Sequence, residues 1–227
     1  MLGKANGGGI VAFLNVNCPN SSTITAVNGN IRLTATGESA SFKLPRTGNW
    51  TVTATYNGIS QSQTVNMSAG QTKTVTLLTS VYLYNAGSYA SGFSSGWSYG
   101  DHSTYVETTG TQYGNNPSIS NGSVNLTGYK YLYAVVQYRV SKDQYAWGGS
   151  EFSILDASNT ELAKQGHYDN TQSGWDTYQP AETWTFDITN INQIAKFKIA
   201  TTYGSGGGDQ SGANGGIILH SIRITTS

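Results

Sequence analysis

Three segments of the sequence combine aromatic side chains with Gly, Asp, Asn, Ser or His, the combination that a sugar-binding site requires. They are residues 97–102, residues 145–149, and residues 166–169 followed by 174–178. A ring packs against the apolar C–H face of a sugar, and fixed polar groups bind its hydroxyls. We expect these segments in loops rather than inside strands. The candidate ligand-binding residues are Trp97, Tyr99, Asp101, His102, Tyr145, Trp147, Tyr168, Asp169, Trp175 and Tyr178.

The same rings have a structural interpretation, because large aromatic side chains also fill protein cores. The tryptophans that would then pack inside the fold are Trp97, Trp175 and Trp184. Tyr129, Tyr131 and Tyr133 alternate along the chain, so we expect them to share one face of a strand. Facing outward they would form a flat platform for a polymer, and facing inward they would belong to the core.

Catalytic motifs are missing from the sequence. It contains no Gly-x-Ser-x-Gly turn, no His-Glu-x-x-His and no phosphate-binding loop. Cys18 is the single cysteine and lies in a part of the chain without histidine, which argues against a Cys–His nucleophile. A glycosidase needs two carboxylates about 5–10 Å apart. The candidates are Glu151, Asp169, Asp176, Glu182 and Asp187. We expect a turn or capping role for Asp156 and Asp187, and no enzymatic activity.

No cofactor or metal site is predicted either. The three histidines are not spaced as zinc ligands, and we expect His220 to be structural within a strand. Residues 204–216 are rich in glycine and are expected to form a flexible linking loop. The alternative is a tip that orders on ligand contact, with Asp209 and Asn214 as oxygen donors. Calcium prefers six to eight oxygens, but the acidic residues match no recognised calcium loop.

The composition indicates an all-β protein. Charged residues make up 11% of the chain, less than half of the usual share of about 25%. Gly, Ser, Thr and Asn take their place, and 28 glycines with 4 prolines indicate many tight turns. The formal net charge is zero, so no basic field attracts nucleic acid. The charge is nevertheless uneven, with residues 1–80 basic and residues 81–227 acidic.

Short apolar–polar alternations separated by turn signals divide the chain into two strand-rich parts. We expect seven strands in residues 10–79: 10–16, 23–27, 31–36, 39–44, 50–56, 60–67 and 73–78. We expect eight more in residues 80–227: 81–84, 105–107, 124–126, 131–140, 151–155, 183–188, 196–202 and 216–224. Turn signals include Cys18-Pro19-Asn20, Gly37 and Asn57-Gly58, the last typical of a two-residue type I′ hairpin.

The remaining residues, 1–9, read as a glycine-rich tail or linker. They contain no apolar segment of the kind found in signal peptides or membrane spans. Either export is handled otherwise or the chain is a fragment cut at this joint. The predicted fold is all-β, with a small immunoglobulin-like or transthyretin-like β-sandwich followed by a larger jelly-roll β-sandwich.

Residues 41–54 (Ser-Phe-Lys-Leu-Pro-Arg-Thr-Gly-Asn-Trp-Thr-Val-Thr-Ala) resemble the F-x-L-P-x-x-G-x-W-T-V-T signature of small β-sandwich modules. These modules recur in minor structural and tail-associated proteins of phages of Gram-positive gut bacteria. With the glycine-rich start and residues 64–77, the resemblance covers about a third of the chain. From the pattern itself we expect four core residues and a turn over 45–49. The expected core residues are Phe42, Leu44, Trp50 and Val52.

The second part resembles the galactose-binding-like jelly rolls of carbohydrate-binding modules and phage receptor-binding or tail proteins. The matches are residues 83–87 with Gly96-Trp97, the final strand, and residues 124–132, which are similar to an I-D-L-T-G-Y-x-x-L entry into a long strand. Asn125 stands where the family often has Asp, which removes an expected cap or ion ligand.

These observations predict a non-catalytic virion-surface or tail-associated protein that binds host-surface carbohydrate through its C-terminal jelly roll. The alternatives are a purely structural virion assembly or decoration protein, and a carbohydrate-binding module of a secreted bacterial protein. The expected partners are a glycan and other virion proteins, with a homo-oligomer left open and neither nucleic acid nor membrane expected. The expected location is the virion surface or tail, or the extracellular space.

Overall fold

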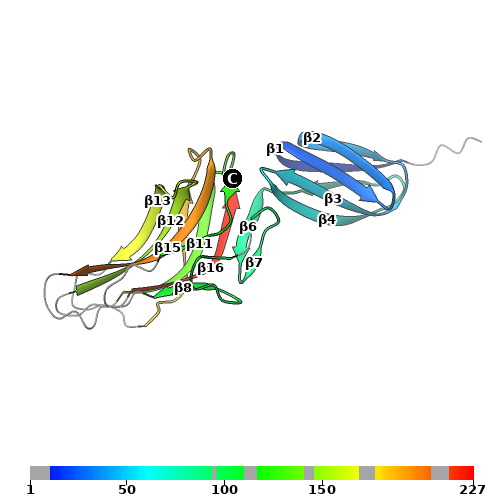
Figure 1. Ribbon diagram of the computed structural model, residues 1–227. Coiled ribbons are helices and arrows are strands. Elements are labelled where there is room, and N and C mark those ends of the chain that lie inside the picture. Colours follow the sequence, from blue (N-terminus) through cyan, green and yellow to red (C-terminus); the bar gives the residue numbers. More distant parts are fainter. Residues whose placement is uncertain (1–10, 94–95, 110–116, 141–145, 169–176, 206–214) are drawn as a thin grey trace, which may run out of the picture. The chain divides into compact units, whose positions relative to one another are not determined.

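The computed structural model confirms the all-β class, because its described residues form strands and turns without a helix. Accordingly, no helix in the described part of the chain is long and apolar enough to cross a membrane. The chain divides into two compact units, residues 1–79 and 80–227 (Figure 1). Side chains at 20, 146–148 and 202–205 are not described. The structure describes residues 11–93, 96–109, 117–140, 146–168, 177–205 and 215–227.

The first unit is organised around two long, paired strands. Its strands are β1 (Ala12–Asn28), β2 (Ile31–Leu44), β3 (Gly48–Tyr56), β4 (Ile59–Met67) and β5 (Thr72–Thr76). The first half of β1 pairs with β2 and, in parallel, with β5, whereas its second half pairs with β2 and β3. β1 thus pairs with β2 and β5 in its first half and with β2 and β3 in its second half, so all of these strands belong to one sheet.

Two expected breaks in the first unit are wrong, and this reduces seven expected strands to five. Cys18-Pro19-Asn20 lies within β1, where the register with β2 shifts between Asn17 and Ser22. Gly37 lies within β2 with a φ of 147°. Proline donates no ladder hydrogen bond, and a bulge absorbs such a residue without ending the strand. The turn signals therefore mark a bend in one long hairpin.

The core of the first unit agrees with the sequence pattern. Phe42, Leu44, Trp50 and Val52 are all buried, and Trp50 is fully enclosed. Asn57-Gly58 joins β3 to β4 with φ values of 50° and 83°. Positive φ at both central residues is what the type I′ turn requires, so that prediction is confirmed. Residues 1–9, expected to be a tail or linker, lie outside the described residues.

The second unit is a β-sandwich of two sheets. The first sheet has the order β10-β15-β12-β13, with β9 paired to β15. Its strands are β9 (Ser118–Ile119), β10 (Val124–Asn125), β12 (Ala146–Asp156), β13 (Glu161–Tyr168) and β15 (Ile194–Ser205). The second sheet has the order β14-β11-β16-β6-β7, with β8 paired to β16. Its strands are β6 (Ser80–Asn85), β7 (Ser88–Tyr89), β8 (Val106–Thr109), β11 (Tyr131–Val140), β14 (Glu182–Asp187) and β16 (Gly215–Thr225).

Aromatic rings from both sheets fill the space between them. Phe152 of β12 packs against Phe186 of β14 and Phe197 of β15, with ring centroids 5.4 and 6.0 Å apart. Trp184 is 1% exposed. Tyr129 is also buried, so the expectation that it shares a face with Tyr131 and Tyr133 is wrong. The strand begins only at Tyr131, and strand alternation does not extend into the turn before it.

The sequence missed three strands of the second unit, β7, β9 and β13. Two of them contain only two residues. β13 is longer but lies at the edge of its sheet, and none of its side chains is fully buried. An edge strand exposed along its whole length carries no apolar alternation. His167 and Tyr168 therefore lie in a strand rather than in the expected loop, and Trp147 likewise lies in β12.

Candidate functional site

The candidate site lies on the outer face of the sheet formed by β12, β13 and β15. Phe152 and Ile154 of β12 point into the core, so the alternating residues Glu151 and Ser153 point outward. Side chains that face each other across antiparallel strands lie on the same side of the sheet. Ser153 is paired with Lys164 of β13 and with Lys198 of β15. Register thus brings charged residues distant in sequence onto one face.

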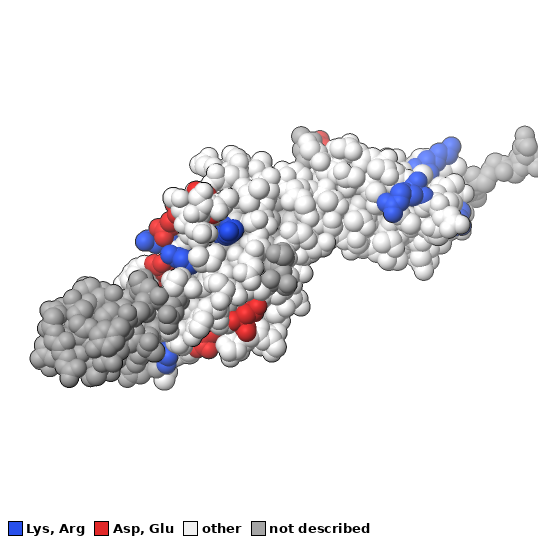
Figure 2. Space-filling view, viewed as in Figure 1, with Lys and Arg blue, Asp and Glu red and all other residues white. Residues whose placement is uncertain are grey.

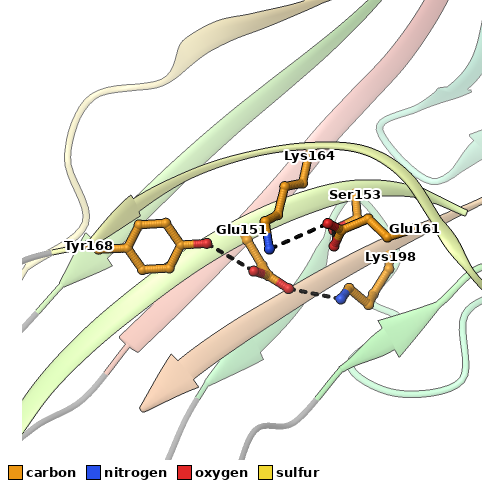
Figure 3. A network of polar contacts seen from close by, with 6 residues as sticks. All are labelled: Glu151, Ser153, Glu161, Lys164, Tyr168 and Lys198. Atoms are coloured by element: carbon orange, nitrogen blue, oxygen red, sulfur yellow. Dashed lines mark hydrogen bonds and ion pairs between the residues drawn. The ribbon is translucent and has the colours of Figure 1, made fainter. Parts of the chain in front are cut away.

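The Glu151 carboxylate makes polar contacts with two side chains on this face (Figure 3). Lys198 Nζ lies 2.8 Å from Glu151 Oε1, and the Tyr168 hydroxyl donates to Oε2 over 3.0 Å. The two partners approach the carboxylate from opposite sides. A second pair lies beside it, with Lys164 Nζ 3.4 Å from Glu161 Oε1. Ser153 donates to the other oxygen of Glu161 over 3.3 Å.

A pocket of about 240 Å³ opens against these groups. Leu155 and Ala200 provide apolar lining, and Glu151, Glu161 and Lys198 provide polar lining. Acidic and basic side chains lie side by side over the region of β12, β13 and β15, whereas most of the visible surface is uncharged (Figure 2). Tyr168 is 52% exposed, so its ring remains accessible beside the pocket. Apolar and polar groups therefore meet at one open hollow, which we call the groove.

Burying the Glu151–Lys198 ion pair costs solvation free energy. The Glu151 side chain is only 8% exposed and that of Lys198 is 20% exposed. Removing two charges from water costs several kcal/mol per ion, and mutual attraction recovers this only with good geometry and further hydrogen bonds. The Tyr168 hydroxyl supplies such a bond. The pair therefore holds the Glu151 carboxylate and the Lys198 ammonium in a fixed geometry at the wall of the pocket.

We predict that the Tyr168 hydroxyl ionises at a considerably higher pH than the hydroxyl of an ordinary tyrosine. Burial, followed by the hydrogen bond to Glu151, raises its pKa from 10.0 to about 12. The folded protein therefore holds this proton more tightly than the unfolded chain. Its contribution to stability is complete below pH 10 and is lost as the pH rises from about 10 to about 12. Tyrosinate absorbance, compared between wild type and Tyr168→Phe, isolates this titration.

A difference titration centred near pH 10 would contradict the Glu151–Tyr168 contact. The matched control is Tyr99→Phe, because Tyr99 is similarly exposed at 53% and lies outside the groove. Glu151→Gln provides a second check, since removing the negative charge should move the Tyr168 titration toward its ordinary range.

A second polar cluster joins residues from two of the three predicted segments. The Glu107 carboxylate of β8 accepts a hydrogen bond from the Tyr178 hydroxyl and lies 3.9 Å from His102 Nε2. Burial and this bond raise the pKa of Tyr178. The Arg139 guanidinium lies 5.2 Å from the Tyr178 ring centroid, and the Tyr105 ring centroid lies 4.5 Å from that of His102. Glu107 itself had no signal in the sequence.

The other predicted site residues are dispersed. Trp97 is 5% exposed and packs edge-on against Tyr84, so in this structure it has the core role of the alternative interpretation. Tyr99 is exposed, and Asp101 accepts a long hydrogen bond from the Tyr89 hydroxyl at 3.3 Å. The side chain of Trp147 is not described. Three predicted residues lie outside the described residues: Tyr145, Asp169 and Trp175.

The histidines lie apart from one another. His167 stacks on Tyr138 with centroids 4.0 Å apart, and its Nε2 lies 2.9 Å from Glu182 Oε1. His220 lies within β16 as expected, and its Nε2 lies 2.8 Å from the Gln137 side-chain oxygen. In the part of the chain that the structure describes, no group of three His, Cys, Asp or Glu residues could hold a metal ion.

Several acidic and amide side chains cap turns. Asp156 Oδ1 accepts bonds from the backbone amides of Ser158 and Thr160, each 2.8 Å long. Asp187 Oδ1 accepts one from the Thr189 amide, so both expected capping roles are confirmed. Asn125 Oδ1 accepts a bond from the Thr127 amide at 3.0 Å. The expectation that Asn at position 125 removes a cap is wrong, because an amide oxygen closes the same turn.

The first unit contains a larger pocket, of about 370 Å³, beside the turn after β2. Among the described residues that line it there is neither a carboxylate nor an aromatic ring. The Arg46 guanidinium beside it already donates to the Asn28 backbone and side-chain oxygens. This pocket is larger than the groove but lacks acidic side chains among its described lining residues. The groove, which has both acidic and basic side chains, therefore remains the candidate binding site.

The groove residues that sequence reasoning missed are Ser153, Glu161, Lys164 and Lys198. Glu151 was considered only as one of five carboxylates, and Tyr168 as a loop aromatic. Glu151 and Lys198 come from strands far apart in the chain, and their contact follows from the pairing of β12 with β15. No sequence motif around Glu151 or Lys198 predicts that these two strands lie side by side.

A scan against known protein families finds no match, and a search of curated proteins finds no relative. Similar solved structures include a chain of infectious bursal disease virus, with 10% identity over 89% of this chain and a TM-score of 0.33. This chain spans about half of that viral chain, 50% of its length.

A carbohydrate-binding module of the β-sandwich superfamily has 11% identity, 96% and 87% coverage of the two chains, and a TM-score of 0.27. An isomalto-dextranase of Arthrobacter globiformis complexed with panose has 13% identity, 90% and 30% coverage, and a TM-score of 0.31. The chain is thus similar to viral and carbohydrate-binding β-sandwich proteins, at levels that assign neither a family nor a function.

Proposed function

We propose that the second unit is a non-catalytic carbohydrate-binding module whose ligand occupies the groove over β12, β13 and β15. One observation carries this proposal. The nearly buried carboxylate of Glu151 is fixed by Lys198 and Tyr168 at the wall of an open pocket. The exposed Tyr168 ring lies at the same place.

The groove offers what a polyhydroxylated ligand requires. Each sugar hydroxyl both donates and accepts hydrogen bonds. Glu151 and Glu161 supply acceptors, and Lys198 supplies a donor. Because these groups already hold one another in place, little side-chain freedom is lost when the ligand binds. The Tyr168 ring offers a flat face for sugar C–H groups.

The same contacts argue against hydrolysis. A glycosidase uses one carboxylic acid to protonate the leaving group and a second carboxylate as nucleophile or base. Lys198 and Tyr168 both donate to Glu151, so each oxygen of this carboxylate already accepts a hydrogen bond from a neighbouring side chain. Glu182, another candidate, is bonded to His167 and to the Trp184 indole N–H. Glu151 thus has a partner at each of its oxygens, and Glu182 has two partners at Oε1.

The biological setting of this module comes from the sequence resemblance. Residues 41–54 resemble modules of phage tail-associated proteins, which supports a virion-surface role with host glycan as the ligand. On this proposal the first unit is a spacer or attachment unit and the second unit performs recognition. A secreted bacterial protein carrying the same two modules would bind glycan through the same groove.

A glycan-array screen of the intact chain tests the proposal. Wild type is compared with Glu151→Gln and Tyr168→Ala. Losing a hydrogen bond to a charged group costs about 1.5–3 kcal/mol, or roughly tenfold to a hundredfold in affinity. Lys43→Met is the matched control, because Lys43 is an exposed lysine of the first unit. Near-ultraviolet circular dichroism confirms that each variant is folded.

Binding that Glu151→Gln and Tyr168→Ala both weaken locates the site in the groove. Binding that neither variant changes places it elsewhere. If wild type binds no host-wall or mucin glycan on the array, the structural alternative is favoured. A stable oligomer in a solution mass measurement would support that alternative further.

A further inference from the structure

The opposite sheet of the second unit presents an aromatic row around one arginine. Arg223 of β16 is paired with Tyr133 of β11 on one side and with Tyr82 of β6 on the other. Tyr133 is in turn paired with Thr185 of β14. Tyr82, Arg223 and Tyr133 therefore form a row across three strands, or about 10 Å at the usual strand spacing of ~4.8 Å. Tyr131 flanks it, with its ring centroid 6.4 Å from that of Tyr133.

This row faces solvent rather than the core. The neighbouring residues Leu132 and Ala134 are fully buried between the sheets, so the alternating tyrosines point the other way. Tyr82 is 51% exposed and Tyr131 is 36% exposed. Several accessible rings grouped on one sheet face are typical of an interaction surface. We call Tyr82, Tyr131, Tyr133 and Arg223 the tyrosine platform.

The Arg223 guanidinium stacks on tyrosine rings rather than on a carboxylate. Its guanidinium carbon lies 4.6 Å from the Tyr133 ring centroid and 5.9 Å from that of Tyr82. Its one described hydrogen bond is a long contact of 3.5 Å to the Ser80 hydroxyl. Among the ion pairs of the described residues, none includes Arg223. Asp187 of β14 lies on the same face, paired with Tyr131, and its carboxylate accepts a hydrogen bond from the Thr189 amide.

We propose that the tyrosine platform is a second ligand site, separate from the groove, and that it binds an acidic oligosaccharide through a sugar carboxylate. The planar guanidinium presents paired donors that match the two oxygens of a carboxylate. Stacking on Tyr133 holds that fork in place before the ligand arrives. The exposed rings on either side accept the apolar faces of neighbouring sugar residues. Cation and rings in one row thus select a sugar chain that carries negative charge.

Calorimetric titration of the full chain with oligogalacturonate tests this site. The comparison ligand is the same oligosaccharide with its carboxyl groups reduced to alcohols. Wild type should bind the acidic form at least about tenfold more tightly, as expected for a charge-assisted hydrogen bond. Arg223→Gln should remove this preference. Arg223→Lys should restore only part of it, because lysine keeps the charge without the planar fork.

Two further variants separate the platform from its rivals. Tyr82→Ser should weaken both sugars alike, because it removes a stacking surface and no charge, whereas Lys43→Met should change neither. Equal affinity for the acidic and reduced forms, or an unchanged preference in Arg223→Gln, overturns the proposal. So does a change of solution mass on Tyr82→Ser or Arg223→Gln, which would make the platform a subunit contact. The groove is judged separately, by the Glu151 and Tyr168 variants.

Discussion

Replacing Lys198 with Met lowers the free energy of unfolding of the second unit by about 3 kcal/mol. The substitution leaves the Glu151 carboxylate, 8% exposed, without its ammonium partner, and stranding one half of a buried ion pair costs about 3–5 kcal/mol. The Tyr168 hydrogen bond retains part of the stabilisation, which places the expected value at the lower end. Urea denaturation of the full chain measures it. Tyrosine near-ultraviolet circular dichroism follows this unit, which contains 14 of the 15 tyrosines.

Lys164→Met is the matched control on the same face of the sheet. Its partner Glu161 is 3.4 Å away, and both side chains are much more exposed, at 50% and 37%. Exposed pairs contribute about 1 kcal/mol or less. Combining Glu151→Gln with Lys198→Met should recover most of the loss, because no charge then remains buried. Equal costs for Lys198→Met and Lys164→Met would show that water reaches Glu151 freely.

Replacing Trp50 with Ala destabilises the first unit by about 3–5 kcal/mol, the range measured when a large buried aromatic side chain is removed. Trp50 is fully buried, and its indole N–H donates to the Arg46 carbonyl over 3.2 Å. Since domains are stable by only about 5–15 kcal/mol, this loss is a large part of the whole. Hydrogen exchange followed by mass spectrometry should show faster exchange throughout β1 to β5.

The consequence of Trp50→Ala for function separates the roles of the two units. Every residue that lines the groove belongs to the second unit, so exchange in β12, β13 and β15 and the proposed glycan binding should remain as in wild type. Trp50→Phe is the control, because it keeps most of the ring volume and should cost much less. If the second unit loses protection together with the first, the two units unfold as one and the spacer assignment is wrong.

The all-β class and most of the buried alternations can be predicted from the sequence. The pattern around Trp50 and Val52 predicted core residues that are buried in the structure. This was possible because successive side chains of a strand alternate between its two faces, which is a local property of the sequence. Asn57-Gly58 predicted its turn for the same reason, since the φ values of two residues decide it. The basic and the acidic part of the sequence meet near residue 80, and the structure divides between Thr79 and Ser80.

The contacts between polar side chains depend on how the strands are ordered in the folded protein. Glu151 lies beside Lys198 because β12 pairs with β15, and beside Tyr168 because β13 covers the other edge of β12. Arg223 lies between Tyr133 and Tyr82 through a similar pairing of three separated strands. Alternation predicts that a side chain faces outward, but not which strand lies next to it. Strand order and register arise from the packing of the whole unit, and they place the groove and the tyrosine platform on opposite sheets.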